Sequence, residues 1–163
     1  MSQPASMIPG TNIPCYVFET TGDVTTHVAQ MIANTTRERN SFGQKAVLRL
    51  ATGSTPVGVY RELIRLHQED GLDFSQCVII GLDEYYGLGN DKIQSHSRWI
   101  RQQLLDHVNV AEQHIHLLDG TVPIDEIESY CLRYDEKIRK SGGIDLLLLG
   151  IGGNGSIGFN EPF

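Results

Sequence analysis

The chain has 163 residues, of which 40% are hydrophobic, enough to build one domain around a hydrophobic core. Its 20 acidic and 13 basic side chains give a formal net charge of −7 at pH 7. This balance argues against a general nucleic-acid or membrane-surface binder, since both need clustered positive charge. A phosphorylated small molecule is not excluded, because a helix N-terminus can hold an anion inside an acidic protein.

The cysteines and the N-terminus indicate a cytoplasmic protein. Cys15, Cys77 and Cys131 are odd in number and widely spaced, which favours reduced structural thiols over a disulfide framework or a zinc site. Residues 1–12 lack a basic segment and a long apolar core, so we expect a loose leader and not a signal peptide. No run approaches the ~18 apolar residues that a membrane span needs. We expect a soluble protein with no membrane or nucleic-acid partner, and a homo-oligomer is left open.

The first half of the chain alternates between helical and strand patterns. A helix is predicted to begin near Asp23. Its apolar face repeats at helical spacing and consists of Val24, Val28, Met31 and Ile32. Residues 45–51 are short and apolar-rich and predict a strand. Thr55 and Pro56 then suit the N-cap and the first position of a second helix. The apolar face of that helix consists of Val59, Leu63 and Leu66.

The second half repeats the alternation. Strands are predicted at residues 77–82 and 115–118, with a shorter helix at residues 97–106 between them. A further helix is indicated by apolar residues spaced three and four apart, namely Ile124, Ile127, Cys131, Tyr134 and Ile138. Its first turns are acidic and its last turn is basic, which suits the helix dipole. Gly142 and Gly143 are expected to end it, before a last strand at residues 144–149.

This order of elements predicts the fold class. Repeated strand, loop and helix indicate an α/β fold with a mainly parallel, twisted, Rossmann-like sheet and helices on both faces. The chain shows no internal repeat, low-complexity tract or convincing linker. We therefore expect a single α/β domain over residues 13–163.

Three loops follow the predicted strands, so they should open at the same edge of the sheet. The first contains Thr52, Gly53, Ser54 and Thr55, whose N–H groups and hydroxyls at a helix start suit a bound phosphate. A simple turn with a helix cap would explain that loop equally well. The second begins with Asp83, and a carboxylate that leaves a buried strand is partly desolvated, which favours use as a general base. A solvated acidic pair is the alternative.

The third loop is rich in glycine. Residues 150–158 include five glycines among nine positions, more than a simple turn requires. Among the histidines, His96 follows Ser95 in a polar loop and could line the cleft, but no pattern singles it out. No pair of histidines has metal-ligand spacing with a supporting carboxylate, so we expect no metal.

These three loops resemble the signature loops of the glucosamine-6-phosphate deaminase/isomerase family, within the superfamily that includes 6-phosphogluconolactonases. The similar segments are Leu-Ala-Thr-Gly-Ser-Thr-Pro at 50–56, Leu-Asp-Glu-Tyr-Tyr-Gly-Leu at 82–88 and Gly-Ile-Gly-Gly-Asn-Gly-Ser-Ile-Gly-Phe-Asn-Glu-Pro at 150–162. They occur in the family's order, and the resemblance covers about residues 45 to 163. The Asp-Glu-Tyr and Phe-Asn-Glu-Pro elements favour the deaminase branch.

The resemblance implies conversion of glucosamine 6-phosphate into fructose 6-phosphate and ammonia, without an organic cofactor or metal. Asp83 matches the base that moves a proton between C2 and C1. The substrate-binding set is expected to be Thr52, Gly53, Ser54, Thr55 and Gly155, with the first loop holding the phosphate. Glu161 matches a carboxylate that supports the family's ring-opening histidine.

The sequence departs from the family pattern at two positions and at its end. Ser156 stands where the ring-opening histidine is expected, and Asn154 stands where many members have aspartate. An isolated serine hydroxyl cannot store a proton near neutral pH as imidazole does, so Ser156 predicts impaired ring opening. Family members also continue well past Phe163, so we expect the domain to be incomplete at its C-terminus.

Two other functions are compatible with these residues. A 6-phosphogluconolactonase would use a base to activate water at a lactone carbonyl. A non-catalytic phosphosugar-binding module would keep recognition, with Ser156 marking lost chemistry.

Overall fold

The computed structural model describes residues 4–162, and its centre is a four-stranded sheet. The strands lie in the order β5-β4-β3-β6, and every neighbouring pair is parallel. Their bounds are Ala46–Leu50 for β3, Cys77–Gly81 for β4, Ile115–His116 for β5 and Leu146–Leu147 for β6. The predicted α/β fold with a parallel sheet is confirmed.

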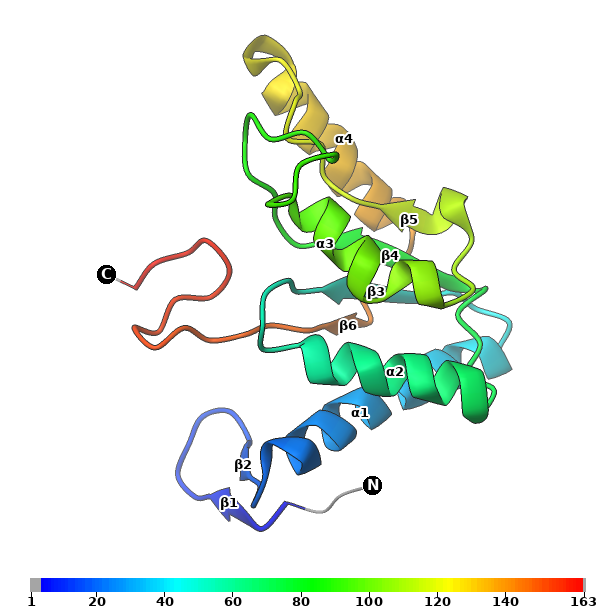
Figure 1. The fold of residues 1–163 in the computed structure, drawn as a ribbon, viewed down its shortest axis with the longest axis vertical. Coiled ribbons are helices and arrows are strands. Elements are labelled where there is room, and N and C mark those ends of the chain that lie inside the picture. The colour runs from blue at the N-terminus through cyan, green and yellow to red at the C-terminus, as the bar shows by residue number, and fades with distance from the viewer. Residues whose placement is uncertain (1–3, 163) are drawn as a thin grey trace.

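Four helices surround this sheet (Figure 1). Their bounds are Thr21–Ser41 for α1, Val57–Glu69 for α2, His96–Gln103 for α3 and Ile127–Lys140 for α4. Short 3-10 turns lie at Leu105–His107, Glu112–His114 and Ile124–Glu126. None of the helices among the described residues is long and apolar enough to cross a membrane.

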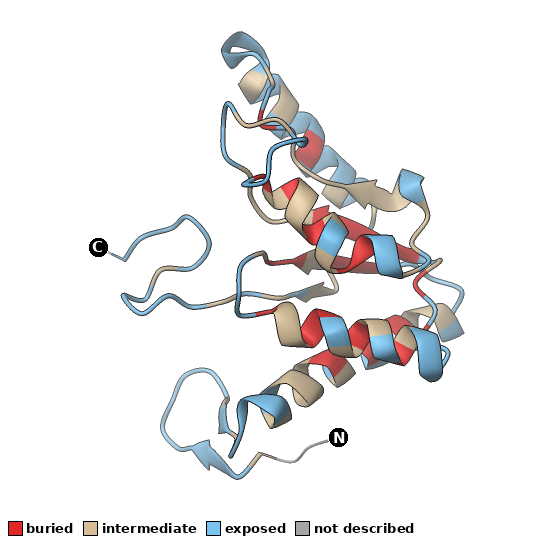
Figure 2. Cartoon of the chain, in the orientation of Figure 1, coloured by how far each residue is buried: buried red, intermediate tan, exposed pale blue. Residues whose placement is uncertain are grey.

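Side chains of the sheet alternate between two cores, because successive residues of a strand point to opposite faces. Leu48 and Ile79 belong to the larger core, which α1, α2 and α3 complete. Val47 and Ile80 belong to a smaller core that is closed by Tyr134 of α4. Figure 2 shows the buried residues gathered in the sheet and on the helix faces turned toward it. The helices therefore cover both faces, as predicted.

The strand order defines a switch point between β3 and β6. From β3 the chain moves outward through β4 to β5, and then α4 carries it back to β6 on the other side of β3. In open parallel sheets, ligands bind beyond the carboxyl ends of the strands at such a point. The loops that leave β3, β4 and β6 lie on the same side of the molecule in Figure 1.

The predicted apolar face of α1 is wrong in part. The buried residues of α1 are Ala29, Ile32, Ala33 and Thr36. Val24 and Met31, which the spacing put on the inner face, are 41% and 49% exposed. The helix instead presents its small residues inward, which lets α1 approach its neighbours closely. At the α1–α2 contact, a β-carbon at Gly58 would lie only 2.9 Å from the hydroxyl of Thr25.

Two further predictions need correction, one for the start of α2 and one for the apolar face of α4. The N-cap of α2 is Pro56 and not Thr55, and no side chain forms a capping hydrogen bond there. Of the apolar positions predicted for α4, Ile124 lies in a preceding 3-10 turn and is 70% exposed. Tyr134 is the buried residue of α4, because this helix packs against the smaller core on one face of the sheet and leaves most of its own surface to solvent.

The ends of the domain also differ from expectation. Within the predicted loose leader of residues 1–12, Ser6–Ile8 forms strand β1, which pairs antiparallel with β2, Cys15–Val17. Backbone hydrogen bonds hold this exposed hairpin, and its sequence gives no apolar alternation to predict it. Residues 1–3 lie outside the described residues. The predicted strand 144–149 is shortened to Leu146–Leu147, since only these residues pair with β3.

Candidate functional site

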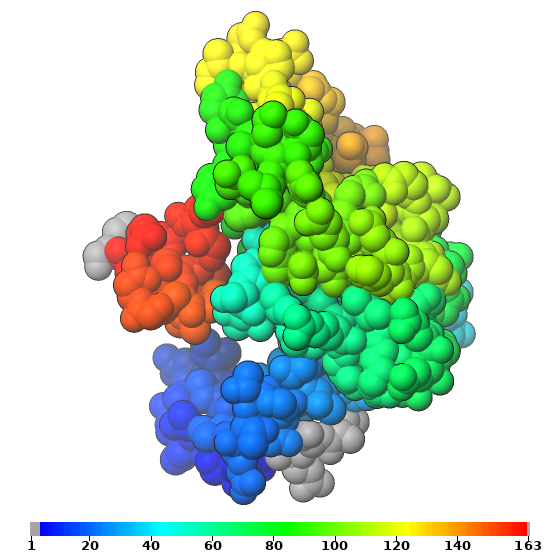
Figure 3. All heavy atoms as spheres, in the orientation of Figure 1, coloured from blue at the N-terminus to red at the C-terminus, as the bar shows by residue number. Residues whose placement is uncertain are grey.

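The loops after β3, β4 and β6 enclose a cavity of about 310 Å³ at the switch point. Its polar lining comes from four separate stretches of sequence and includes Thr52, Thr55, Asp83, His96 and Ser156. Figure 3 shows the C-terminal segment projecting from the body of the molecule on this side. The volume is within the range of pockets that bind small molecules.

Asp83 and His96 form the charged centre of this cavity. Asp83 follows β4, and His96 is the first residue of α3, so each is held by a regular element. The Oδ1 atom of Asp83 lies 2.6 Å from Nδ1 of His96, and both side chains are mostly buried, at 16% and 18% exposed. The hydrogen bond to Asp83 raises the pKa of His96, although burial opposes this shift. The pair is therefore a carboxylate beside an imidazole that tends to carry a proton.

Glu84 holds this pair in place by capping α3. One of its carboxylate oxygens accepts from the backbone N–H groups of Tyr85 and His96, at 2.9 and 3.0 Å. The other accepts from the Ser95 hydroxyl at 2.7 Å and from the Ser97 N–H at 2.9 Å. Burial raises the pKa of Glu84, but these four hydrogen bonds outweigh it and the net pKa is lowered. An ionised carboxylate at a helix N-terminus also suits the helix dipole.

Aromatic rings attach the glycine-rich loop to the pair. The ring of Phe159 lies 5.5 Å from that of His96 and 5.0 Å from that of Tyr85, measured between centroids. Tyr85 in turn packs edge-on against His96 at 4.9 Å. Gly158 then passes close to the carboxylate, because a β-carbon there would lie 3.4 Å from Oδ2 of Asp83. Glycine at this position, with φ of 58°, keeps that oxygen accessible.

Inside the glycine-rich loop, polar side chains form a short chain. The Ser156 hydroxyl donates to Oδ1 of Asn154 at 2.9 Å, and the Asn154 amide donates to Glu161 at 2.6 Å. A β-carbon at Gly152 would lie 2.5 Å from the Ser156 hydroxyl, so glycine leaves space for this side chain. The chain orients Ser156, whose hydroxyl can pass a proton to a neighbour but cannot hold an extra one near neutral pH.

The structure brings together some of the residues predicted for the site and not others. Thr52, Gly53, Thr55, Asp83 and Ser156 line the cavity. The remaining four lie outside its lining, namely Ser54, Asn154, Gly155 and Glu161. Of these, Asn154 accepts a hydrogen bond from Ser156, and Glu161 accepts one from Asn154, so both connect to the cavity through Ser156.

His96 is the site residue that sequence reasoning did not single out. It follows a polar stretch without periodicity, and its role depends on a contact with Asp83 across thirteen positions. A signal was present in Ser95, which is the N-cap of α3 and accepts from the Arg98 N–H at 3.2 Å. A capping residue beside a histidine places that histidine at a helix start, where it can face the neighbouring loop.

No group of three His, Cys, Asp or Glu side chains within residues 4–162 is arranged to hold a metal ion. Asp83 and His96 can exchange protons with a ligand, and the hydroxyls of Thr52, Thr55 and Ser156 can form hydrogen bonds with it. Burial raises the pKa of Cys77 to about 12, so this thiol packs as an apolar group in the core.

Several known proteins have sequences similar to this chain. Residues 19–157 match the family described as glucosamine-6-phosphate isomerases/6-phosphogluconolactonase. A glucosamine-6-phosphate deaminase-like protein of Bacteroides thetaiotaomicron is 43% identical over 92% of this chain and 23% of its own length. The glucosamine-6-phosphate deaminase of Alkaliphilus metalliredigens is 49% identical over 72% of this chain and 48% of its own.

A solved structure gives the same result. The chain superposes on a monomeric glucosamine-6-phosphate deaminase with a TM-score of 0.80 and 38% sequence identity, over 88% of this chain and 57% of that one. The chain thus spans about half the length, or less, of the curated relatives it matches.

Proposed function

Because this chain belongs to the family of glucosamine-6-phosphate isomerases and 6-phosphogluconolactonases, we propose that it serves amino-sugar catabolism as a glucosamine-6-phosphate deaminase. The reaction converts glucosamine 6-phosphate and water into fructose 6-phosphate and ammonia. Since the chain spans about half of its relatives, the activity is proposed for the polypeptide that contains it. One observation carries the proposal: a carboxylate, an imidazole and a hydroxyl-lined loop at a helix start face a single cavity at the switch point.

Asp83 is proposed as the base that moves the proton. With Oδ1 held by His96, the second oxygen, Oδ2, lies beside Gly158 and faces the glycine-rich loop. In the open-chain sugar, this oxygen takes the proton from C2 and returns it to C1. The C1 aldehyde oxygen gains a proton and the C2 amine loses one, so that C1 becomes an alcohol and C2 an imine. Water then adds to C2, and the nitrogen leaves as ammonia. A positioned carboxylate is suited to such a transfer.

His96 is proposed to supply the proton exchange that Ser156 cannot. Ring opening requires a proton at the ring oxygen and removal of one from the C1 hydroxyl. The raised pKa of His96 leaves a fraction of its imidazole protonated near neutral pH, so it can donate and then recover a proton. Ser156, oriented by Asn154, would relay a proton between the sugar and this imidazole.

The loop after β3 is proposed to bind the phosphate. Thr52 and Thr55 contribute hydroxyls to the cavity, and α2 begins directly after this loop. Its backbone N–H groups and positive end favour an anion at that position. A phosphate there would direct the sugar carbons toward Asp83.

A coupled assay for ammonia release from glucosamine 6-phosphate tests these roles. We expect Asp83→Asn to abolish turnover and His96→Asn to lower it roughly 10²–10⁴-fold. Ser156→His should raise the rate of the native protein and restore that of His96→Asn, because it returns an imidazole to the loop. His107→Asn, on an exposed histidine outside the cavity, is the matched control and should leave the rate unchanged.

The same preparations separate the other functions. Turnover that survives Asp83→Asn would rule out Asp83 as the base. If no variant releases ammonia but the sugar phosphate raises the melting temperature, the protein is a phosphosugar-binding module. Hydrolysis of a phosphogluconolactone without ammonia release would identify a lactonase, in which the Asp83 and His96 pair activates water.

A further inference from the structure

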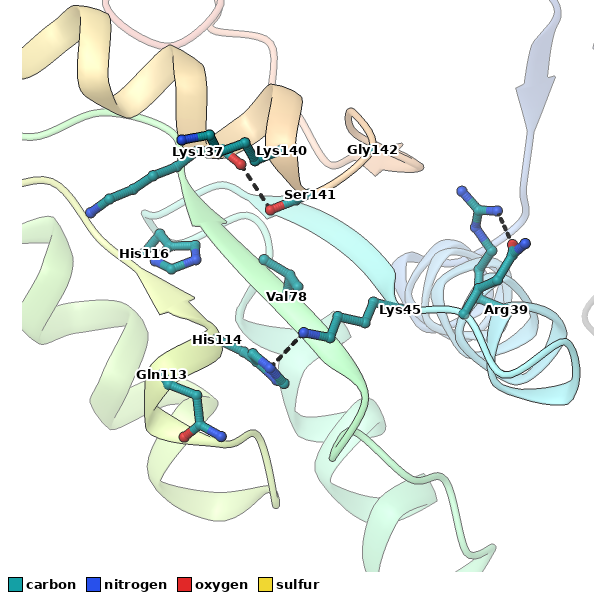
Figure 4. A pocket seen from close by; sticks show the side chains of 11 residues that line it. Arg39, Lys45, Val78, Gln113, His114, His116, Lys137, Lys140, Ser141 and Gly142 are labelled. Carbon is teal, nitrogen blue, oxygen red and sulfur yellow. Dashed lines mark hydrogen bonds between the residues drawn. The ribbon is translucent and has the colours of Figure 1, made fainter.

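A second cavity, of about 600 Å³, lies at the opposite edge of the sheet, far from the loops of the candidate site (Figure 4). The amino ends of β3 and β5, the buried Val78 of β4 and the C-terminal turn of α4 surround it. Its charged and titratable lining consists of Arg39, Lys45, His114, His116, Lys137 and Lys140. Among residues 4–162, no carboxylate lines the cavity. This concentration of positive charge stands out in a chain whose net charge is −7.

Two of the cations have no acidic partner. Among the described residues, neither Lys45 nor Lys137 forms an ion pair with a carboxylate. Lys45 instead places its Nζ atom 2.8 Å from Nε2 of His114 (Figure 4). The remaining ring nitrogen of His114, Nδ1, is buried without a hydrogen-bond partner within residues 4–162. Burying such a polar group without a hydrogen bond is energetically costly.

His116 lies among the positively charged side chains that line the cavity. Burial lowers the pKa of His116, and the neighbouring charges of Lys137, His114 and Lys45 lower it further. Arg39 and Lys140 add to the field, but Arg39 is paired with Asp145 and Lys140 with Glu136. An anion in the cavity would relieve this repulsion.

The end of α4 does not oppose an anion strongly. Helix C-termini carry partial negative charge on their last carbonyls. Here the carbonyl of Lys137 accepts from the backbone N–H and the hydroxyl of Ser141, and the carbonyl of Ile138 accepts from the Gly143 N–H. With these groups satisfied, the lysine side chains of the last turns determine the local charge.

We propose that this cavity binds a compact anion with at least two phosphate groups, such as a sugar bisphosphate or an inorganic polyphosphate. Lys45 and Lys137 would each contact one phosphate, with the imidazoles and Gln113 as further partners. The volume suits a small metabolite. No Phe, Tyr or Trp in the described part of the chain lines the cavity, so these residues offer no ring to stack on the base of a nucleotide. The site is separate from the proposed catalytic one and does not depend on it.

Calorimetric titration with inorganic pyrophosphate tests the proposal, with sulfate as the single-anion comparison. We expect saturable binding with one site, weakened by added salt. Lys45→Met and Lys137→Met should each reduce the affinity about tenfold or more, since each removes a charged contact. Arg139→Met is the matched control. It removes the same charge from α4 at an exposed position outside the cavity and should change the affinity less than twofold.

Histidine ring signals in NMR spectra identify where the anion sits. Binding in this cavity should shift His114 and His116 and leave His96 unchanged. Shifts confined to His96 would place pyrophosphate at the loop after β3 and overturn the proposal. So would equal weakening in all three variants, or the absence of saturable binding. Melting temperatures of the free variants check that each one is folded.

Discussion

Replacing Glu84 by Gln tests whether one carboxylate organises the candidate site. Glu84 accepts four hydrogen bonds, two at each oxygen, and three of them come from the first residues and N-cap of α3. The amide of Gln keeps one acceptor oxygen and places an NH₂ group against the donors at the other. We therefore expect two hydrogen bonds to be lost together with the favourable charge at the helix N-terminus.

The magnitude follows from these contacts. A hydrogen bond to a charged group contributes about 1.5–3 kcal/mol, and an ion at a helix end about 0.3–1 kcal/mol. Because Glu84 is partly exposed, solvent screening reduces these values. We expect Glu84→Gln to lower the free energy of unfolding by about 2–3 kcal/mol, which lowers Tm by roughly 5–10 °C for a domain of this size.

Thermal unfolding followed by circular dichroism measures this effect. Glu136→Gln is the control, since Glu136 forms an exposed ion pair with Lys140 one turn along α4 and should leave Tm nearly unchanged. If Glu84→Gln melts like Glu136→Gln, the carboxylate does not hold the start of α3. Glu84 would then not be the group that caps α3 and fixes the position of His96.

Three further changes have definite expectations. Gly120→Ala should lower the free energy of unfolding, measured by denaturant titration, by about 3 kcal/mol, because the added β-carbon would lie 2.2 Å from the carbonyl oxygen of Tyr85. A variant as stable as the native protein would contradict this packing. Asp145→Asn should lower the free energy of unfolding at pH 7 by about 1–2 kcal/mol, because it removes the ion pair with Arg39. This value is below that of a fully buried pair, since Arg39 is partly exposed and solvent screens the interaction. Burial raises the pKa of Asp145, but the hydrogen bonds from Arg39 and from the Val47 N–H and the charge of Arg39 together outweigh burial and lower it. The stabilisation is therefore present above the ordinary pKa of 3.8 and is lost on acidification below it, so the difference between native and variant stability should vanish in acid; a constant difference would refute the assignment. In NMR titration, the pKa of His96 should lie above its ordinary value of 6.5 and should return toward it in Asp83→Asn. The stabilisation from this pair is therefore complete below pH 6.5 and declines as pH rises through the raised pKa. An unchanged titration of His96 in the variant would show that the pair does not form in solution.

Local patterns determined much of the architecture. The apolar-rich run at β3 and the continuous apolar run at β4 predict buried parallel strands, because strands covered on both faces need mostly apolar residues. The three loops follow directly from these strands, so Asp83 and Thr52 could be placed at one edge of the sheet without knowing the tertiary structure. The inward face of α1 could not be predicted from the sequence, since Met31 and Ala29 fit helical spacing equally well. In the structure the smaller residue, Ala29, is the one that packs against the core.

By itself, the sequence determined the fold class, the family resemblance and the positions of Asp83 and Ser156 in their loops, because each depends on neighbours along the chain. Only the tertiary structure decided that His96 is the partner of Asp83 and that Lys45 and Lys137 share a cavity. These groups lie on separate elements, and their meeting depends on strand order and helix packing. No local sequence pattern predicts such contacts. They form because the whole sheet is buried between its helices, and this burial provides the free energy.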